Sequence, residues 1–431
     1  MGLKIAVFGL WHLGSVTAAG LAELGYKVVG TGFNKKAVNS LSSGRPPIFE
    51  PGLEELIKKH IKSKRLSFTF DKKASLGEAD FIFVAFDTRV DEKDQVDLTD
   101  IKLAAAEISK YIKNGAIVLV SSQVPVGTCS QLKEKISRNS KAKFDVCYIP
   151  ENLRLGEALN SFLRPDRIVI GANSAATLER VKKLFQPLKC EKIAMSVESA
   201  EMTKHALNAY LATCISFIGE ISDVCELSGA SAMDVVRALK TDRRVSPYAP
   251  INPGLGFSGG TLARDVQVLR NYGDAKNYET KILDAVIQVN NERMHLVSRK
   301  LEKLFGSLKS LKVGILGLTY KPGTDTLRRS LSLKVAKDLI SRGAIVKAFD
   351  PKVTVAISSV PKLEVCGNVE DVARGSDVLV LLTEWPEFKN MPLKKIKSLM
   401  KTPIFVDAKN FLDPKKFKKL KFRYVGVGYE T

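Results

Sequence analysis

A glycine-bounded turn near the N-terminus constrains the fold more than any other feature of the sequence. The apolar run Lys4–Phe8 leads into Gly9-Leu10-Trp11-His12-Leu13-Gly14, and a helical pattern follows. A strand, a glycine turn and a helix in this order are typical of a dinucleotide-binding site, where the helix N-terminus faces a pyrophosphate. Trp11 occupies the place of the second glycine in G-x-G-x-x-G. We expect a modified turn that still binds a cofactor through Gly9, Trp11, His12, Leu13 and Gly14, with a destroyed site as the alternative.

Strand-like runs alternate with helical patterns in both halves of the chain. This alternation predicts an α/β fold with parallel sheets covered by helices. The region between the two halves has the helical period, notably at 199–227. We therefore expect two doubly wound, Rossmann-like domains joined by a mostly helical central domain that contains a long helix. The expected domains are residues 1–195, 196–305 and 306–431.

The chain is basic, with 67 Lys and Arg residues against 46 Asp and Glu residues and a net charge of +21. Such a charge attracts phosphates, anionic lipid or nucleic acid, but its dispersed arrangement identifies none of them. The six cysteines form no C-x-x-C pair and suggest neither a disulfide framework nor a metal site. No apolar run approaches the roughly 18 residues needed to span a membrane. We expect a cytoplasmic protein with no metal and no membrane span.

The end of the second expected strand bears on cofactor choice. An Asp or Glu at this place accepts the ribose hydroxyls of NAD, but the sequence has Gly32 there, followed by Asn34, Lys35 and Lys36. Loss of the carboxylate removes its repulsion of a 2′-phosphate, and the lysines supply cations. We therefore expect NAD(P) binding at Asn34 and Lys35, with NADP slightly favoured. NAD bound beside solvated lysines is the alternative.

Several ordered segments together resemble the UDP-glucose/GDP-mannose dehydrogenase family, and the resemblance covers nearly the whole chain. The segments are Gly44–Leu53, Val124–Thr128, Pro150–Arg154, Arg164–Gly171, Glu201–Ala209, Gly256–Asp265, Tyr320–Asp325 and Thr383–Phe388. The resemblance implies a cofactor-binding first domain, a central domain that forms a homodimer, and a last domain that binds the nucleotide of a UDP-sugar or related nucleotide-sugar. It also implies oxidation of the C6 alcohol of the sugar, through an aldehyde, to a carboxylate.

The resemblance also implies roles for individual residues. Lys204 and Asn208 would form an oxyanion site for the C6 oxygen, since residues four apart on a helix face one way. Asp265 would position or deprotonate a water molecule, and Glu151 would line the same pocket. Thr88 would lie near the nicotinamide, and Gln123 would also contact the cofactor. The expected substrate contacts are Arg154, Arg244, Phe257, Gly259, Arg264, Lys321, Arg328 and Lys409.

The sequence departs from the family at the nucleophile. The family has a cysteine that forms a thioester, and matching back from Asp265 places Thr261 at that position. A threonine hydroxyl is a poor substitute for a thiolate, and no base for it is evident. Three functions follow as hypotheses. The first, which we favour, is an NAD(P)-dependent nucleotide-sugar dehydrogenase that uses a non-standard route. The second is a catalytically silent nucleotide-sugar-binding protein, and the third is a basic binder of nucleic acid or membrane surface, supported by charge alone.

The histidines outside the cofactor turn have weaker interpretations. His205 adjoins Lys204 and could serve as a base near neutral pH, but consecutive helical residues point about 100° apart. Packing within the helix is therefore the favoured interpretation for His205. His60 and His295 read as surface positions.

Overall fold

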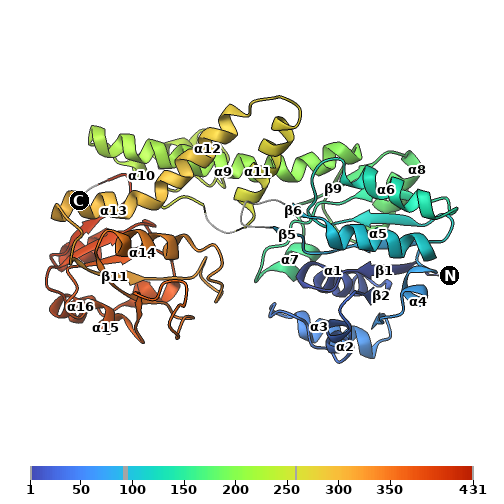
Figure 1. Ribbon diagram of the computed structural model, residues 1–431, viewed down its shortest axis with the longest axis horizontal. Coiled ribbons are helices and arrows are strands. Elements are labelled where there is room, and N and C mark those ends of the chain that lie inside the picture. The colour runs from blue at the N-terminus through green and yellow to red at the C-terminus, as the bar shows by residue number, and fades with distance from the viewer. Residues whose placement is uncertain (1, 91–95, 258–259, 430–431) are drawn as a thin grey trace. The chain divides into compact units, whose positions relative to one another are not determined.

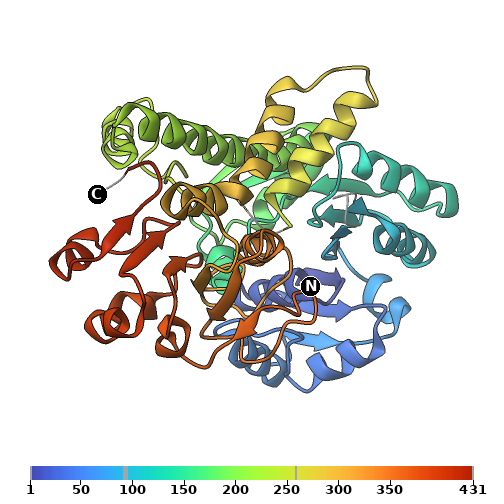
Figure 2. The ribbon, with the colours of Figure 1, turned by 60° about the vertical axis from the view of Figure 1, so that its left-hand side comes forward.

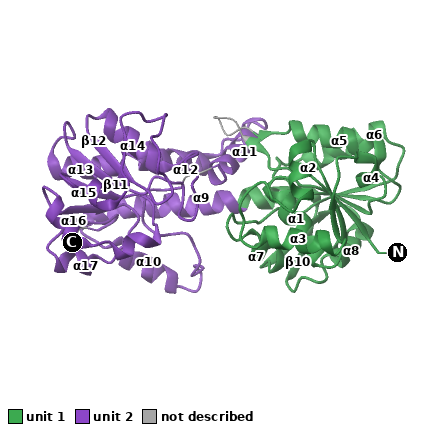
Figure 3. Cartoon of the chain, turned by 90° about the horizontal axis from the view of Figure 1, so that it is seen from below, with its two compact units in different colours: residues 1–206 green, residues 207–431 purple. Residues whose placement is uncertain are grey.

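The computed structural model describes residues 2–90, 96–257 and 260–429. The chain forms two compact units, Met1–Ala206 and Leu207–Thr431, which Figure 3 colours separately. The long helix α9 (Val197–Ser228) begins in the first unit and continues into the second; it is the long green helix of Figure 2. Each unit contains its own sheet with helices on both faces, which confirms the expected α/β class.

The first unit is built on a sheet with the strand order β10-β9-β8-β7-β4-β1-β2-β3. Its strands are β1 Lys4–Phe8, β2 Lys27–Thr31, β3 Leu66–Phe68, β4 Phe81–Val84, β7 Ile117–Val120, β8 Asp145–Tyr148, β9 Arg167–Ala172 and β10 Glu191–Met195. The order of the strands from β3 to β8 is that of a Rossmann fold, with the switch point between β1 and β4. A separate antiparallel pair is formed by β5 Arg89–Val90 and β6 Val96–Asp97.

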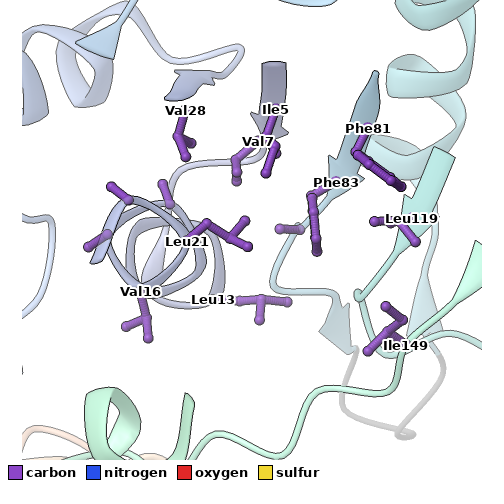
Figure 4. Packing of buried hydrophobic residues seen from close by; sticks show 14 of the residues in the cluster. Ile5, Val7, Leu13, Val16, Leu21, Val28, Phe81, Phe83, Leu119 and Ile149 are labelled. Atoms are coloured by element: carbon purple, nitrogen blue, oxygen red, sulfur yellow. The ribbon is translucent and has the colours of Figure 1, made fainter. Parts of the chain in front are cut away.

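Two apolar layers hold the helices of the first unit on its sheet. One face carries α1 His12–Glu23, α2 Lys35–Ser42, α3 Leu53–Lys62, α7 Ala158–Leu163 and α8 Ala175–Leu184. The other carries α4 Lys72–Leu76, α5 Thr99–Tyr111, α6 Thr128–Asn139 and the start of α9. In Figure 4, Leu13 and Leu21 of α1 point towards Val7 of β1 and Phe83 of β4. This packing fixes the N-terminus of α1 at the carboxyl end of β1.

The second unit begins with helices and ends with a second sheet. The helical elements are the remainder of α9, α10 Ala232–Thr241, α11 Leu262–Asp274, α12 Lys281–Glu292, the 3-10 turn η1 Arg293–His295 and α13 Leu296–Phe305 (Figure 1). The sheet has the order β13-β12-β11-β14-β15-β16, again that of a Rossmann fold. Its strands are β11 Lys312–Leu316, β12 Ile345–Phe349, β13 Glu364–Val365, β14 Val378–Leu381, β15 Ile404–Asp407 and β16 Arg423–Val425. Its helical elements are α14 Leu331–Ser341, α15 Val369–Ala373, η2 Pro386–Asn390, α16 Leu393–Leu399 and α17 Pro414–Lys419.

One expectation about strand direction is wrong. The first sheet is not wholly parallel, because β9 runs antiparallel to β8, with Tyr148 opposite Gly171. A parallel connection needs a crossover of a dozen or more residues, usually a full helix across the sheet. The only helix between β8 and β9 is the 6-residue α7, which packs against α1. The chain therefore enters β9 from the opposite end.

Candidate active site

The turn between β1 and α1 has the geometry of a dinucleotide-binding turn. Gly9 has φ +106°, and a Cβ there would lie 2.6 Å from the carbonyl oxygen of Ala85. A Cβ on Gly14 would overlap the carbonyl oxygen of Gly9. Trp11, by contrast, has φ −94° and an exposed side chain, so its position needs no glycine. The modified turn is therefore intact, and the first backbone N–H groups of α1 remain placed for a diphosphate.

A carboxylate that the sequence analysis did not single out lies at this helix N-terminus. Asp87 follows β4, and its Oδ2 accepts a hydrogen bond of 3.2 Å from the backbone N–H of Leu13. Desolvation raises the pKa of Asp87 to about 6, although the Leu13 N–H and the nearby His12 act in the opposite direction. A sequence signal existed, because the carboxyl ends of parallel strands β1 and β4 meet at one edge of the sheet.

A second acid, Glu50, ties the cofactor turn to two other segments. His12 Nε2 lies 3.0 Å from Glu50 Oε2, so the ring of His12 is directed at this carboxylate. Glu50 also accepts hydrogen bonds from the backbone N–H groups of Gly156 (2.9 Å) and Ala158 (2.8 Å). Glu50 is almost completely buried, so these donors compensate its desolvation.

The end of β2 has Gly32 where related sites have an acid, as the sequence indicated. The space around Gly32 would nevertheless accommodate a side chain. A Cβ on Gly32 would meet Leu10 at 3.7 Å, an ordinary contact. Asn34 caps α2 by accepting from the N–H groups at positions 36 and 37, and Lys35 is exposed. The ammonium of Lys72, which the sequence analysis missed, donates to the carbonyl of Gly32 (2.6 Å). Burial lowers the pKa of Lys72.

The two residues expected to contact the cofactor from these loops, Thr88 and Gln123, lie in adjoining loops of the first unit. Thr88 Oγ donates to the carbonyl of Gln123 at 2.8 Å, which joins the loop after β4 to the loop after β7. Gln123 is buried.

The expected catalytic residues of the first unit contact each other. Lys204, on α9, is buried and donates from Nζ to the carbonyl oxygen of Glu151 at 2.8 Å. Its Nζ also lies 3.3 Å from Glu151 Oε1. Glu151 Oε2 accepts from the N–H of Leu153 at 2.9 Å. The Glu151 carboxylate is therefore oriented, and the ammonium is held beside it.

The expected catalytic residues of the second unit also form a group. Asn208 lies one helical turn after Lys204, and its Nδ2 donates to Oδ2 of the fully buried Asp265. Arg264 is buried as well, with Nε 3.7 Å from Asp265 Oδ1 and without a hydrogen-bond partner in the described parts of the chain. Thr261 is exposed at the start of α11, and its hydroxyl makes no capping hydrogen bond.

The expected substrate contacts fall into three groups. Exposed cations are Arg154, Arg244, which pairs with Asp242, and Arg328. Lys409 pairs with Glu384 at 3.2 Å, and Lys321 is half-buried. The Phe257 side chain is instead buried in the core of the central helices, and its backbone N–H donates to Asn290 Oδ1 at 2.8 Å. Gly259 lies outside the described residues.

The histidine interpretations were correct in one case and wrong in another. His205 is buried, with Nε2 2.8 Å from the carbonyl oxygen of Val124, so it packs the helix as expected. His60 is not a surface residue: it is buried against Glu23, with Nε2 2.6 Å from its carboxylate. His295 is partly exposed beside Asp338. The sequence around His60 is charged, but α3 turns this position towards α1.

Family models match the chain in three consecutive segments. The NAD binding domain of the UDP-glucose/GDP-mannose dehydrogenase family matches residues 3–189, its central domain residues 198–292, and its UDP binding domain residues 314–414. The chain belongs to this family. It is therefore an NAD-dependent dehydrogenase that acts on an alcohol. Each of its two units contains one Rossmann-like sheet.

Individual relatives match over nearly their whole length. UDP-glucose 6-dehydrogenase TuaD of Bacillus subtilis (strain 168) is 34% identical over 430 residues, which cover 99% of this chain and 93% of the relative. A UDP-glucose 6-dehydrogenase of Pseudomonas aeruginosa is 33% identical, with 99% and 97% covered. The structure of a UDP-glucose dehydrogenase from Pyrobaculum islandicum superposes with a TM-score of 0.88 at 30% identity, covering 100% of this chain and 98% of that one.

Two kinds of feature, a membrane-spanning helix and a metal-binding cluster, are absent from the described residues. Within residues 2–90, 96–257 and 260–429, no helix has both the length and the apolar content to cross a membrane. The same residues contain no cluster of three or more His, Cys, Asp or Glu side chains suited to a metal ion.

Proposed function

We propose that this family member oxidises the C6 alcohol of a UDP-sugar, or of a related nucleotide-sugar, by a route without a covalent thioester. One observation carries the proposal: α9 presents Lys204 and Asn208 one turn apart, each fixed by an acid, Glu151 for the lysine and Asp265 for the amide. Such a pair of donors suits an oxygen that gains negative charge during the reaction. The names of the relatives support the substrate class.

The residues of the proposed site have distinct tasks. The Lys204 ammonium and the Asn208 amide would donate to the C6 oxygen while its proton passes through a water molecule to the Asp265 carboxylate. An amide nitrogen has a second N–H besides the one directed at Asp265. Glu151 holds the ammonium in place, and Asp265 orients the amide. The close glycine turn at Gly9 and Gly14 and the N–H groups at the start of α1 suit a dinucleotide. When bound, the nicotinamide supplies the hydride acceptor.

The chemistry at Thr261 favours a non-covalent second step. Thr261 is exposed, its hydroxyl makes no capping hydrogen bond, and none of the described residues is bonded to it as an activating base. Two outcomes are compatible with this arrangement. Either the enzyme releases the aldehyde, or it oxidises the aldehyde hydrate. In the second case Lys204 would donate to the hydrate oxygen and Asp265 would accept the proton.

The decisive experiment counts reduced nicotinamide formed per sugar consumed, for a panel of UDP- and GDP-sugars. Two per sugar indicates full oxidation, and one indicates an aldehyde product. The variant Thr261→Ala should keep the wild-type ratio, whereas Asn208→Ala should lower the rate. No turnover with sugar binding intact would refute the proposal and support a silent binding protein.

We further propose that the enzyme uses NADP at least as well as NAD. With Gly32 in place of an acid, no carboxylate at this position would repel a 2′-phosphate, and the exposed Lys35 three residues on would supply a cation for it. Because a Cβ on Gly32 meets only ordinary contacts, Gly32→Asp should fold and should lower NADP use relative to NAD. An unchanged preference in Gly32→Asp would contradict this proposal.

We also propose a homodimer formed along α9. Tyr210, Phe217, Val224 and Leu227 are exposed large apolar side chains on this helix. Their spacings of seven, seven and three residues place them in one seam, as in a coiled coil. Exposed aromatic and aliphatic side chains in a row mark an interaction surface more often than a solvated one.

A further inference from the structure

The Asp87 carboxylate accepts a hydrogen bond from a backbone N–H group that a bound dinucleotide needs. In a Rossmann-like domain the N-terminus of the first helix binds the diphosphate through its free backbone N–H groups. Here the Leu13 N–H, in the first turn of α1, donates to Asp87 Oδ2 at 3.2 Å. The carboxylate comes from the loop after β4, so it is no part of α1 and is not an ordinary helix cap.

The charges around Asp87 do not neutralise it fully. His12 faces it from the turn, but the His12 ring is also directed at Glu50 at 3.0 Å. Glu151 faces it from the loop after β8 and adds negative charge, although Lys204 pairs with Glu151 at 3.3 Å. A diphosphate brought to the Leu13 N–H would therefore meet a carboxylate that already accepts a hydrogen bond from this group.

We propose that Asp87 competes with the cofactor diphosphate for the N-terminus of α1, so that the cofactor binds the protein only when Asp87 is protonated or displaced. Asp87 then inhibits cofactor binding while it is ionised and makes no favourable contact with the bound cofactor. This inference rests on the proposed dinucleotide site and adds a residue that sets its affinity and pH dependence.

The direction of the pH effect follows from the state of the carboxyl group. The pKa of Asp87 is raised to about 6, mainly by desolvation, so the group is protonated in a sizeable fraction of molecules at pH 5.5 and ionised at pH 8. Above the pKa, protonation on binding weakens the apparent affinity by up to about tenfold per pH unit. Below it, affinity becomes independent of this group.

The test measures binding of NAD+ to the full chain, with no sugar present and no turnover. The chain has two tryptophans: Trp11, exposed in the cofactor turn, and Trp385, buried in the second unit. Quenching of Trp11 fluorescence therefore reports cofactor binding. We compare the wild type, Asp87→Asn and the control Asp274→Asn, which removes an exposed carboxylate from α11, between pH 5.5 and 8.5. Calorimetry in buffers of different ionisation enthalpy counts the protons taken up.

We expect Asp87→Asn to bind NAD+ at least about tenfold more tightly than the wild type at pH 8 and similarly at pH 5.5. The wild type should take up protons on binding at pH 8, and the variant should take up fewer. Asp274→Asn should follow the wild type. Equal affinities of wild type and Asp87→Asn at pH 8, or weaker binding by the variant, would overturn the inference and make Asp87 a bystander or a cofactor ligand. Folded proteins that bind no NAD+ at any pH, Asp87→Asn included, would overturn the proposed function as well.

Discussion

The substitution Gly14→Ala tests the cofactor turn most directly. The added Cβ would overlap the carbonyl oxygen of Gly9 and would lie 3.2 Å from the carbonyl oxygen of Ala85. Both neighbours are backbone atoms, so relief requires a shift of the helix relative to the turn by more than about 1 Å, a misplacement that can weaken a site about a hundredfold. Overpacking of this kind also lowers the free energy of unfolding by about 1–3 kcal/mol.

The matched control is Gly32→Ala at the end of the next strand, where the new Cβ meets Leu10 at 3.7 Å. We expect this variant to bind NAD+ within about twofold of the wild type, because the contact is ordinary and the backbone φ needs no glycine. Affinity is measured by quenching of Trp11 fluorescence, and stability by denaturant unfolding. The reasoning fails if Gly14→Ala binds NAD+ as well as Gly32→Ala does while both are folded.

Three further predictions concern the catalytic pair, the dimer and acid stability. Asn208→Ala leaves the buried Asp265 short of a donor, so the free energy of unfolding should fall by about 1–3 kcal/mol, and denaturant curves equal to the wild type would contradict this. Phe217→Asp places a charge in the exposed seam of α9, and light scattering should show monomers where the wild type shows dimers; an unchanged mass would refute the seam. Hydrogen bonding to Lys59 lowers the pKa of Glu23, so this pair stabilises the fold above the unfolded pKa of Glu23 and the stabilisation is lost as pH falls through its lowered folded value. In Glu23→Gln, the free energy of unfolding should therefore fall less steeply than in the wild type as the pH is lowered. A pH dependence identical to that of the wild type would contradict the prediction.

Sequence patterns located the elements of this fold because burial dictates them. The apolar run Lys4–Phe8 became the central strand β1 at the expected bounds, since a strand covered by helices on both faces must be mostly apolar. The direction of β9 was not visible, because direction depends on where the preceding connection packs and not on the composition of the strand.

The part of the candidate site that could be predicted from the sequence consists of residues whose relative positions are set by a single helix. Lys204 and Asn208 share a helical face by spacing alone. Asp87, Glu50 and Lys72 were missed because their partners come from other strands and loops, and a charged residue in a loop usually reads as solvated. Only the meeting of strand ends at one sheet edge could have indicated Asp87.

The buried Glu50 has a consequence for how variants of this enzyme are read. Its carboxylate contacts the His12 ring in the cofactor turn and accepts hydrogen bonds from the backbone N–H groups of Gly156 and Ala158. Glu50 therefore connects the cofactor turn to the segment that follows Glu151. A change at Glu50 would remove its contacts with His12, Gly156 and Ala158 at once. Because the cofactor turn and the segment after Glu151 would both lose support, the KM for cofactor and the KM for sugar should rise together, as they would on loss of a binding residue.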